Sequence, residues 1–241
     1  WSRNPGVVSS INDDRVNSIY LPDTEIPDGV VASADIAEVA RHSELVIIAT
    51  PSHATRGVLE SMASELPATA TLVSAAKGIE IESGKRISQL VAEVLGSSST
   101  ARFVCLSGPS FAKEVVARHP TAIVAASVNP EARAEVQAAL SSESLRVYTN
   151  DDVIGTELGG SVKNVMAIAA GMVAGLGFGS NSLAALITRG LAEITRLAVN
   201  QGAHDAASEA PRFALLNITW SYQLDPLSSI FMLIVTGVGL C

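Results

Sequence analysis

Cysteine, histidine and basic residues are all scarce in this chain, and each shortage excludes a class of protein. Its 241 residues include only two cysteines, Cys105 and Cys241, which cannot form a disulfide framework. The four histidines lie far apart and show no metal-ligand spacing, so we expect no metal site. Lysine and arginine total 16 against 24 aspartate and glutamate, and this net charge of −8 argues against a nucleic-acid coat and a basic membrane-surface protein.

Charged residues of either sign are also few. They make up 17% of the chain against 48% hydrophobic residues, which is too apolar for a disordered protein. The length predicts one or two domains with a sizeable core. The chain opens without a secretory signal peptide, so we expect a cytoplasmic protein. The acidic balance still leaves room for a local basic pocket that binds an anionic substrate.

Both ends of the chain are unusual for a complete globular protein. There is no initiator methionine, and the chain opens at Trp1 in a segment that we interpret as the end of a strand. Residues 226–241 carry no charge. As a helix they would span only about 24 Å, less than the ~30 Å of a membrane core. We therefore expect an interrupted element there rather than a membrane crossing.

Apolar runs and amphipathic stretches alternate through the middle of the chain. Continuous apolar runs, rich in β-branched residues, occupy residues 45–50, 72–76, 103–107 and 122–126. Such runs are typical of strands buried on both faces of a parallel sheet. Amphipathic helical patterns occupy residues 33–41, with Ser33 as the cap, 55–66, 87–95 and 131–140. The alternation predicts an open, doubly wound α/β sheet, whose ligands bind beyond the carboxyl ends of the strands.

The residues directly after these strands are the first candidates for a ligand site. Lys77 follows the second strand, and Gly108 and Ser110 follow the third. Gly108 allows close approach of the backbone, and Ser110 can cap the next helix, so this strand end favours an anion. The alternatives are a plain strand-to-helix turn and a solvated Lys77.

A different pattern begins at residue 151. Residues 153–174 form an apolar helical pattern in which Lys163 follows a pair of glycines. Lysines are rarely buried without a partner or a role, and burial lowers a lysine pKa toward the range of proton transfer. The alternative is a lysine whose ammonium group extends along the surface to water.

A glycine-rich segment follows at residues 175–179. It does not come after a strand, so we reject a dinucleotide-binding loop and interpret it as a connection between helices. The next helix is predicted at residues 183–199, with Ser180 or Asn181 as its cap.

Several short segments carry a family resemblance when they are taken together. They are WSRN at residues 1–4, YLP at 20–22, AKG at 76–78, LSGPSFAKE at 106–114, RVYTN at 146–150, ELGGSVKN at 157–164 and ALITRGLAE at 185–193. In this order and spacing they resemble the NAD(P)-dependent glycerol-3-phosphate dehydrogenases of the bacterial type. The resemblance covers about residues 1–204.

The resemblance implies a fold and an activity. It implies a partial Rossmann-type, doubly wound parallel sheet in residues 1–150, without its first strand and glycine loop, followed by the start of an all-α domain in residues 151–204. The implied reaction interconverts dihydroxyacetone phosphate and sn-glycerol 3-phosphate with NAD or NADP, a step in phospholipid precursor synthesis. The partner is then a small phosphorylated triose, and neither nucleic acid nor a membrane is expected.

The resemblance also implies roles for individual residues. Lys163 is the implied general acid and base. The implied substrate site contains Lys77, Gly108, Ser110, Lys163 and Asn164. The implied cofactor contacts are Arg3, Asn4, Tyr20, Lys77 and Ala112. If Lys77 and Lys163 address one substrate, we expect their ammonium groups to converge within roughly 10 Å, a distance over which like charges still interact. No metal is implied.

The chain departs from the family pattern at both ends. The first strand and glycine loop should precede Trp1, and the later Asp and Arg-Asn motifs of the family do not appear. Residues 205–241 form an atypical apolar tail that weakly resembles the antiporter-like large subunit of respiratory complex I. The alternatives are therefore an inactive fragment or chimera, or a related 2-hydroxyacid or 6-phosphogluconate-type dehydrogenase. The choice between NAD and NADP, and between a monomer and a homodimer, stays open.

Overall fold

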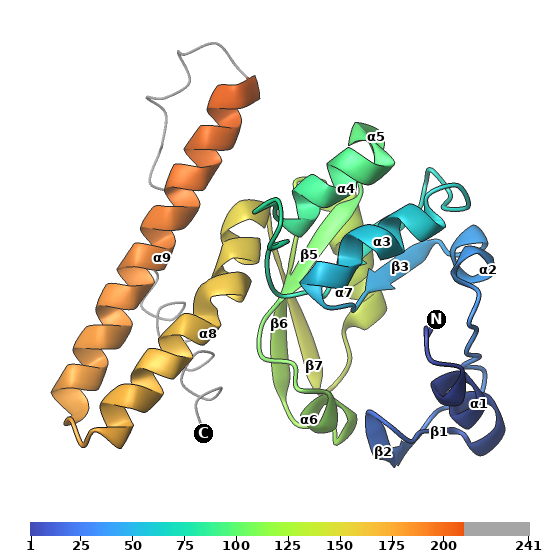
Figure 1. The fold of residues 1–241 in the computed structure, drawn as a ribbon, viewed down its shortest axis with the longest axis horizontal. Coiled ribbons are helices and arrows are strands. Elements are labelled where there is room, and N and C mark those ends of the chain that lie inside the picture. The colour runs from blue at the N-terminus through green and yellow to red at the C-terminus, as the bar shows by residue number, and fades with distance from the viewer. Residues whose placement is uncertain (210–241) are drawn as a thin grey trace.

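A computed structural model describes residues 1–209, except for the side chains of residues 97, 98 and 203–209. An α/β unit comes first in the chain, and two long helices follow it (Figure 1). The expectations for the tail beyond residue 209 lie outside this part of the chain.

The helices of this part are α1 (Pro5–Asp14), α2 (Ile36–Arg41), α3 (Ser52–Met62), α4 (Ile87–Leu95), α5 (Ser97–Thr100), α6 (Ala112–Val116), α7 (Pro130–Leu140), α8 (Val153–Gly175) and α9 (Ser180–Glu209). The strands are β1 (Val16–Asn17), β2 (Leu21–Glu25), β3 (Leu45–Ile48), β4 (Thr71–Ser74), β5 (Phe103–Ser107), β6 (Thr121–Ala126) and β7 (Leu145–Asn150). Every strand and helix predicted between residues 33 and 199 is present, with shifts of a few residues at some ends.

The main sheet has the order β3-β4-β5-β6-β7 and is mixed rather than parallel throughout. All neighbouring strands in it are parallel except β5 and β6, which pair antiparallel with Cys105 opposite Ala126. The predicted doubly wound, parallel sheet is confirmed as the main pattern, with this one antiparallel step. A parallel crossover needs a helix that packs on the sheet, and α6, which joins these strands, has only five residues and buries none of them.

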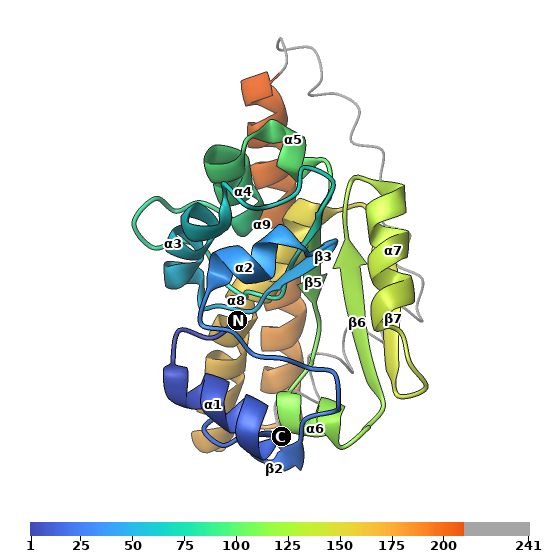
Figure 2. The ribbon, with the colours of Figure 1, turned by 90° about the vertical axis from the view of Figure 1, so that its right-hand side faces the viewer.

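Helices cover both faces of this sheet, which explains the continuous apolar runs. On β4, Leu72 packs into a cluster with Leu59 of α3 and Leu90 of α4. The next residue, Val73, packs on the other face with Val136 of α7. Figure 2 shows α3 and α4 on one side of the strands and α7 on the other. Neighbouring residues point to opposite faces of a strand, so both must be apolar when both faces are buried.

The start of the chain and the start of α2 differ from the prediction. Residues 1–4 form no strand, because Asn4 is the N-cap of α1 and its side chain accepts a hydrogen bond from the backbone N–H of Gly6. The cap of α2 is Asp35, which accepts from two backbone N–H groups of the first turn. Ser33 instead accepts from the backbone N–H of Asp35 and donates to Glu38. The predicted cap therefore lies two residues too early.

Two long helices, α8 and α9, pack against each other and run in opposite directions (Figure 1). By length and composition alone α8 is apolar enough to cross a membrane. Here its first turns pack on β5 and β6 instead. This contact joins the helical pair to the sheet.

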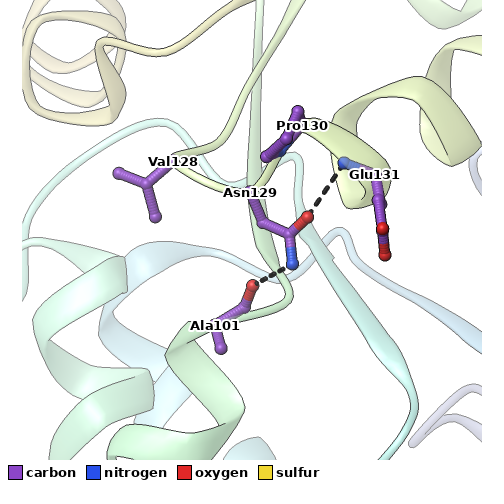
Figure 3. Close-up of a pocket in the computed structure, with 5 residues that line it drawn as sticks. All are labelled: Ala101, Val128, Asn129, Pro130 and Glu131. Carbon is purple, nitrogen blue, oxygen red and sulfur yellow. Dashed lines mark hydrogen bonds between the residues drawn. The ribbon is translucent and has the colours of Figure 1, made fainter.

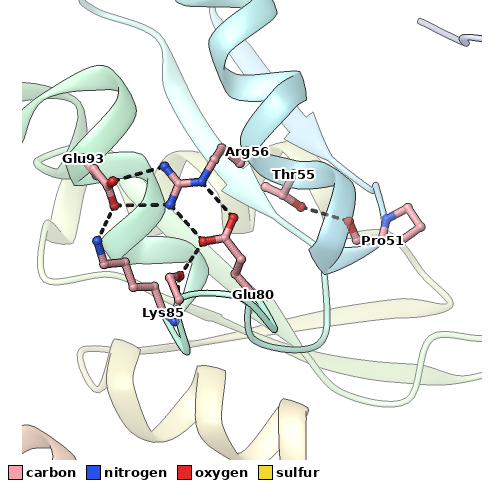
Figure 4. Close-up of polar contacts among 7 residues, drawn as sticks. Pro51, Thr55, Arg56, Glu80, Lys85 and Glu93 are labelled. Atoms are coloured by element: carbon pink, nitrogen blue, oxygen red, sulfur yellow. Dashed lines mark hydrogen bonds and ion pairs between the residues drawn. The ribbon is translucent and has the colours of Figure 1, made fainter.

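Charged side chains brace the loop between β4 and α4 (Figure 4). Arg56 of α3 donates two hydrogen bonds of 2.8 Å to Glu80 in the loop. The same guanidinium contacts Glu93 of α4 at 3.2 Å, and Glu93 also pairs with Lys85. A bidentate arginine–carboxylate pair fixes direction as well as distance. The loop that begins just before Lys77 is thereby tied to both neighbouring helices.

Substitution of Gly108 should weaken the fold, because this residue turns the chain where β5 ends. Its φ of +133° disfavours any side chain, and a Cβ there would lie 2.9 Å from the Cα of Ile123 in β6. We expect Gly108→Ala to lower the free energy of unfolding by about 2–6 kcal/mol, since strain and overpacking each cost about 1–3 kcal/mol. Urea denaturation measures this loss. The control is Gly29→Ala, which has a φ of +88° but nothing within 4 Å; equal losses in both variants would contradict the clash with β6.

Acid should weaken the braced loop through Glu80. Hydrogen bonds from Arg56 and then from Ser83 lower the pKa of Glu80 from 4.5 to about 2. The ionised carboxylate therefore contributes stability that is fully present above pH 4.5 and is lost as the pH falls toward about 2. We expect Glu80→Gln to flatten the fall in unfolding free energy across this window, as measured by denaturant titration at several pH values. The control is Glu143→Gln, at an exposed carboxylate, which should leave the fall in unfolding free energy unchanged. If Glu143→Gln flattened it as much as Glu80→Gln, the assignment to Glu80 would be wrong.

Candidate active site

Lys77 lies where two neighbouring parallel strands end at the same edge of the sheet. It follows β4, and its ammonium group donates to the carbonyl oxygen of Gly108, after β5, at 2.9 Å. The hydroxyl of Ser110 lies 3.5 Å from the same nitrogen. The structure therefore brings three of the predicted substrate-site residues together at the edge where open α/β sheets bind ligands.

Ser110 does not have the capping role that the sequence suggested. The N-cap of α6 is Phe111, and no side chain caps this helix. The Ser110 hydroxyl lies beside the Lys77 ammonium group instead. Ser110 therefore lies beside Lys77 as predicted, but the predicted helix cap is wrong.

Lys163 of α8 meets Lys77 at this edge. The pKa of Lys77 is lowered from 10.5, first by burial and then by the neighbouring charge of Lys163. Two neighbouring ammonium groups repel, so one of them loses its proton more readily. The lowered pKa is that of Lys77, so Lys77 is the member of the pair that gives up its proton more readily.

Three residues of α8, each one turn from the next, contact the α/β unit. Glu157 contacts the start of α4, Gly160 faces β5, and Lys163 meets Lys77. A Cβ on Gly160 would lie 3.1 Å from the hydroxyl oxygen of Ser107, so the helix backbone packs closely on the strand end. Residues three apart are neighbours on the surface of a helix, and these three contacts together cover an arc of about 120° around α8.

The Glu157 carboxylate is buried and accepts hydrogen bonds on both oxygens. Arg86 donates to Oε2 at 2.6 Å, and the Ser88 hydroxyl donates to the same atom at 2.6 Å. The backbone N–H of Ser88 donates to Oε1 at 2.8 Å. The side chains of Arg86 and Glu157 are only 6% and 5% exposed. Neither residue has a role predicted from the sequence, although a glutamate within an apolar helix indicates a buried partner.

Cys105 lies near this carboxylate but is not a nucleophile. Burial, and then the charge of Glu157, raise the pKa of its thiol. The thiol therefore stays protonated at neutral pH, and only the thiolate is reactive. Among the described residues, no group of histidine, cysteine, aspartate or glutamate could hold a metal ion.

The remaining predicted residues lie on exposed surface. Asn164 follows Lys163 on α8, and Ala112 begins α6. Arg3 and Asn4 precede α1, and Tyr20 is 69% exposed between β1 and β2. No hydrogen bond found among the described residues joins any of them to the two lysines.

A shallow pocket at the start of α7 is not part of this site (Figure 3). Ala101 and residues 128–131 line it. The amide of Asn129 donates to the Ala101 carbonyl at 2.9 Å and accepts from the backbone N–H of Glu131, so its polar atoms are already used. Ala101 precedes β5, so the pocket lies at the amino end of the strand whose carboxyl end is next to Lys77.

Comparison with known proteins identifies related chains over most of this sequence. A family model for the N-terminus of NAD-dependent glycerol-3-phosphate dehydrogenase matches residues 1–133, and one for its C-terminus matches residues 152–216. A third, for the N-terminus of chain 5 of NADH-ubiquinone oxidoreductase (complex I), matches residues 212–241, where the tail lies.

Individual relatives agree with the family models. Glycerol-3-phosphate dehydrogenase [NAD(P)+] of Lysinibacillus sphaericus is 47% identical over 84% of this chain and 60% of its own length. The same enzyme of Trichlorobacter lovleyi is 49% identical over 86% of this chain and 62% of its own. The crystal structure of glycerol-3-phosphate dehydrogenase from Coxiella burnetii has a TM-score of 0.75 at 37% identity and covers 84% of this chain and 61% of that one.

The chain thus spans about three-fifths of the length of these relatives. The family models match in the chain order of the α/β unit and the helical pair, and the sequence resemblance is confirmed. Lys77 lies in the part that the first model matches, and Lys163 lies in the part that the second model matches. The chain belongs to the NAD-dependent glycerol-3-phosphate dehydrogenase family.

Proposed function

We propose that this chain carries the proton-transfer part of an enzyme that interconverts dihydroxyacetone phosphate and sn-glycerol 3-phosphate with NAD(P)H. The observation that carries the proposal is that the Gly108 carbonyl holds Lys77 at the carboxyl edge of the sheet, where the charge of Lys163 on α8 acts on it. Two cationic groups suit a substrate that bears a phosphate and a carbonyl oxygen that becomes negative during reduction.

In the proposed reaction the chain's own residues move a proton and hold the substrate. The bound nicotinamide supplies the hydride that reduces the C2 carbonyl carbon. The Lys163 ammonium group gives a proton to the C2 oxygen as its negative charge develops, and in reverse the neutral amine accepts that proton. Lys77, held by the Gly108 carbonyl, stabilises the same oxygen by its charge. Ser110 and Asn164 are the proposed neutral hydrogen-bonding groups of the substrate site.

The residues beside the sheet edge fit the reacting end of a nicotinamide cofactor. Lys77 lies at this edge, and the exposed start of α6 at Ala112 follows the segment that contains Gly108 and Ser110. We assign Arg3, Asn4 and Tyr20 to the adenosine half. The carbonyl oxygen of the Asn4 side chain already accepts from Gly6, so its amide nitrogen is the atom left for a ribose hydroxyl.

The proposed organisation follows from this assignment. Residues 1–150 are the cofactor domain, residues 151–204 begin the helical substrate domain, and residues 205–241 are a separate apolar tail. We place the protein in the cytoplasm, with a homodimer as the assembly to be tested. The competing function is a non-catalytic fragment or chimera, which is favoured by the tail's match to a complex I subunit.

Kinetics with the purified chain separate these functions. Because the chain spans about three-fifths of its relatives, we expect a low rate of NADH or NADPH oxidation that requires dihydroxyacetone phosphate. Lys163→Met should reduce that rate by about 10²–10⁴-fold, the usual contribution of a general acid. Lys85→Met, on the braced loop, is the control and should keep it. Turnover that survives Lys163→Met, or a preference for other keto acids, would refute the proposal, and no turnover at all would favour the fragment.

The lysine pair itself predicts a shifted titration. The pKa of Lys77 is lowered by burial and by Lys163, so removing the second charge should raise it toward 10.5. We expect Lys163→Met to move the Lys77 titration upward, as followed by NMR of isotopically methylated lysines over a pH series. The Lys85 resonance serves as the internal reference. A Lys77 titration that does not move would show that the two ammonium groups do not interact in solution.

A further inference from the structure

We propose that Glu157 is a positioning residue, which acts through Arg86 and Ser88 to fix α8 on the α/β unit so that Lys163 meets Lys77. Its kinetic consequence rests on the proposed function, but its structural consequence does not. The supporting observations are the contacts of Glu157, the spacing along α8, and the loop that joins Lys77 to Arg86.

The contacts of Glu157 fix the helix in more than one direction. Both carboxylate oxygens are held, one by the backbone N–H of Ser88 and the other by Arg86 and the Ser88 hydroxyl. A carboxylate held by several donors from one helix end has little freedom to slide or turn. Since the side chain is about 95% buried and both oxygens are engaged, it does not reach a substrate itself.

The spacing along α8 transmits this constraint to the reacting group. Lys163 lies two residue triplets after Glu157, about 9 Å along the helix axis. Gly160, halfway between them, allows the helix to approach the Ser107 hydroxyl closely. A shift of the Glu157 end therefore displaces Lys163 by a similar amount, because the helix between them is continuous.

The opposite side of the contact is equally fixed. Lys77 and Arg86 lie at the two ends of the loop between β4 and α4, and Glu80 in its middle is held by Arg56. The loop that presents Lys77 to the site therefore also presents Arg86 to α8. One short segment sets both the position of one lysine and the position of the helix that carries the other.

Three variants test the proposal in the full chain. Glu157→Gln keeps the shape and an acceptor for the Ser88 backbone N–H but removes the charge that Arg86 pairs with. Ser88→Ala removes the hydroxyl, which donates to Glu157 and accepts from Arg86, and leaves the charged pair in place. Glu193→Gln is the matched control, because Glu193 makes an exposed ion pair with Arg196 on α9, away from the sheet.

The first readout is the yield of a Lys77–Lys163 cross-link formed by a short amine-reactive reagent, measured by mass spectrometry on protein whose circular dichroism shows it folded. We expect a several-fold lower yield in Glu157→Gln, a smaller loss in Ser88→Ala and no change in Glu193→Gln. An unchanged yield in folded Glu157→Gln, with only a lower melting temperature, would overturn the proposal. If Glu157→Gln does not fold, an unchanged yield in Ser88→Ala overturns it.

The second readout separates this proposal from the proposed function. Where the chain turns over dihydroxyacetone phosphate, kcat should fall by up to about 100-fold in Glu157→Gln, the effect of a displacement near 1 Å. The KM for NAD(P)H should stay the same, because the proposed cofactor contacts lie on the α/β unit. If Glu157→Gln raised the KM for NAD(P)H by up to about 100-fold and left kcat unchanged, a positioning role would be contradicted. If the unaltered chain shows no turnover, only the proposed function is contradicted. The positioning role of Glu157 is then tested by the yield of the Lys77–Lys163 cross-link.

Discussion

Two lysine ammonium groups repel, and this structure has to hold a pair of them together. Lys77 comes from the sheet and Lys163 from α8, so the repulsion acts directly across the contact between the two parts of the chain. It is opposed by the Gly108 carbonyl, which accepts from Lys77, and by the buried Arg86–Glu157 pair, which holds the helix on the unit. A buried ion pair is weak evidence for stability. Here three short hydrogen bonds on the one carboxylate fix its direction. Interactions of neighbouring groups that do not react thus offset the repulsion between the two lysines.

The sheet explains why these neighbours meet. Strands β3, β4 and β5 are parallel, so the residues that follow them lie at one edge, and Lys77 can reach the Gly108 carbonyl. The antiparallel step to β6 then sends the chain back across the sheet, and Gly108 is the residue that permits this turn. The same step puts the pocket near Asn129 at the opposite edge. A single reversal of strand direction thereby separates the lysine site from the pocket at Asn129.

The sequence predicted the strands and helices of the middle of the chain because their patterns depend on burial alone. Leu72 and Val73 are apolar since both faces of β4 are covered, and such a run can be recognised without coordinates. The direction of β6 could not be predicted in this way, because an apolar run has the same composition in either direction. Strand β7 was missed since only Val147 in it is buried. At the site, the lysines and glycines were noticed as unusual residues, whereas Arg86 and Ser88 look like ordinary surface residues until Glu157 is placed beside them.

The carboxylates around the lysine pair are already paired with arginines and do not neutralise it. The chain as a whole is acidic, with a net charge of −8, yet the carboxylates next to the site are already engaged. Glu80, three residues after Lys77, is held by Arg56, and Glu157, six residues before Lys163, is held by Arg86. Each of these pairs is neutral, so neither carboxylate cancels the charge of a lysine. These two ion pairs therefore leave the charge of the lysine pair uncancelled, as the anionic substrate of the proposed reaction requires.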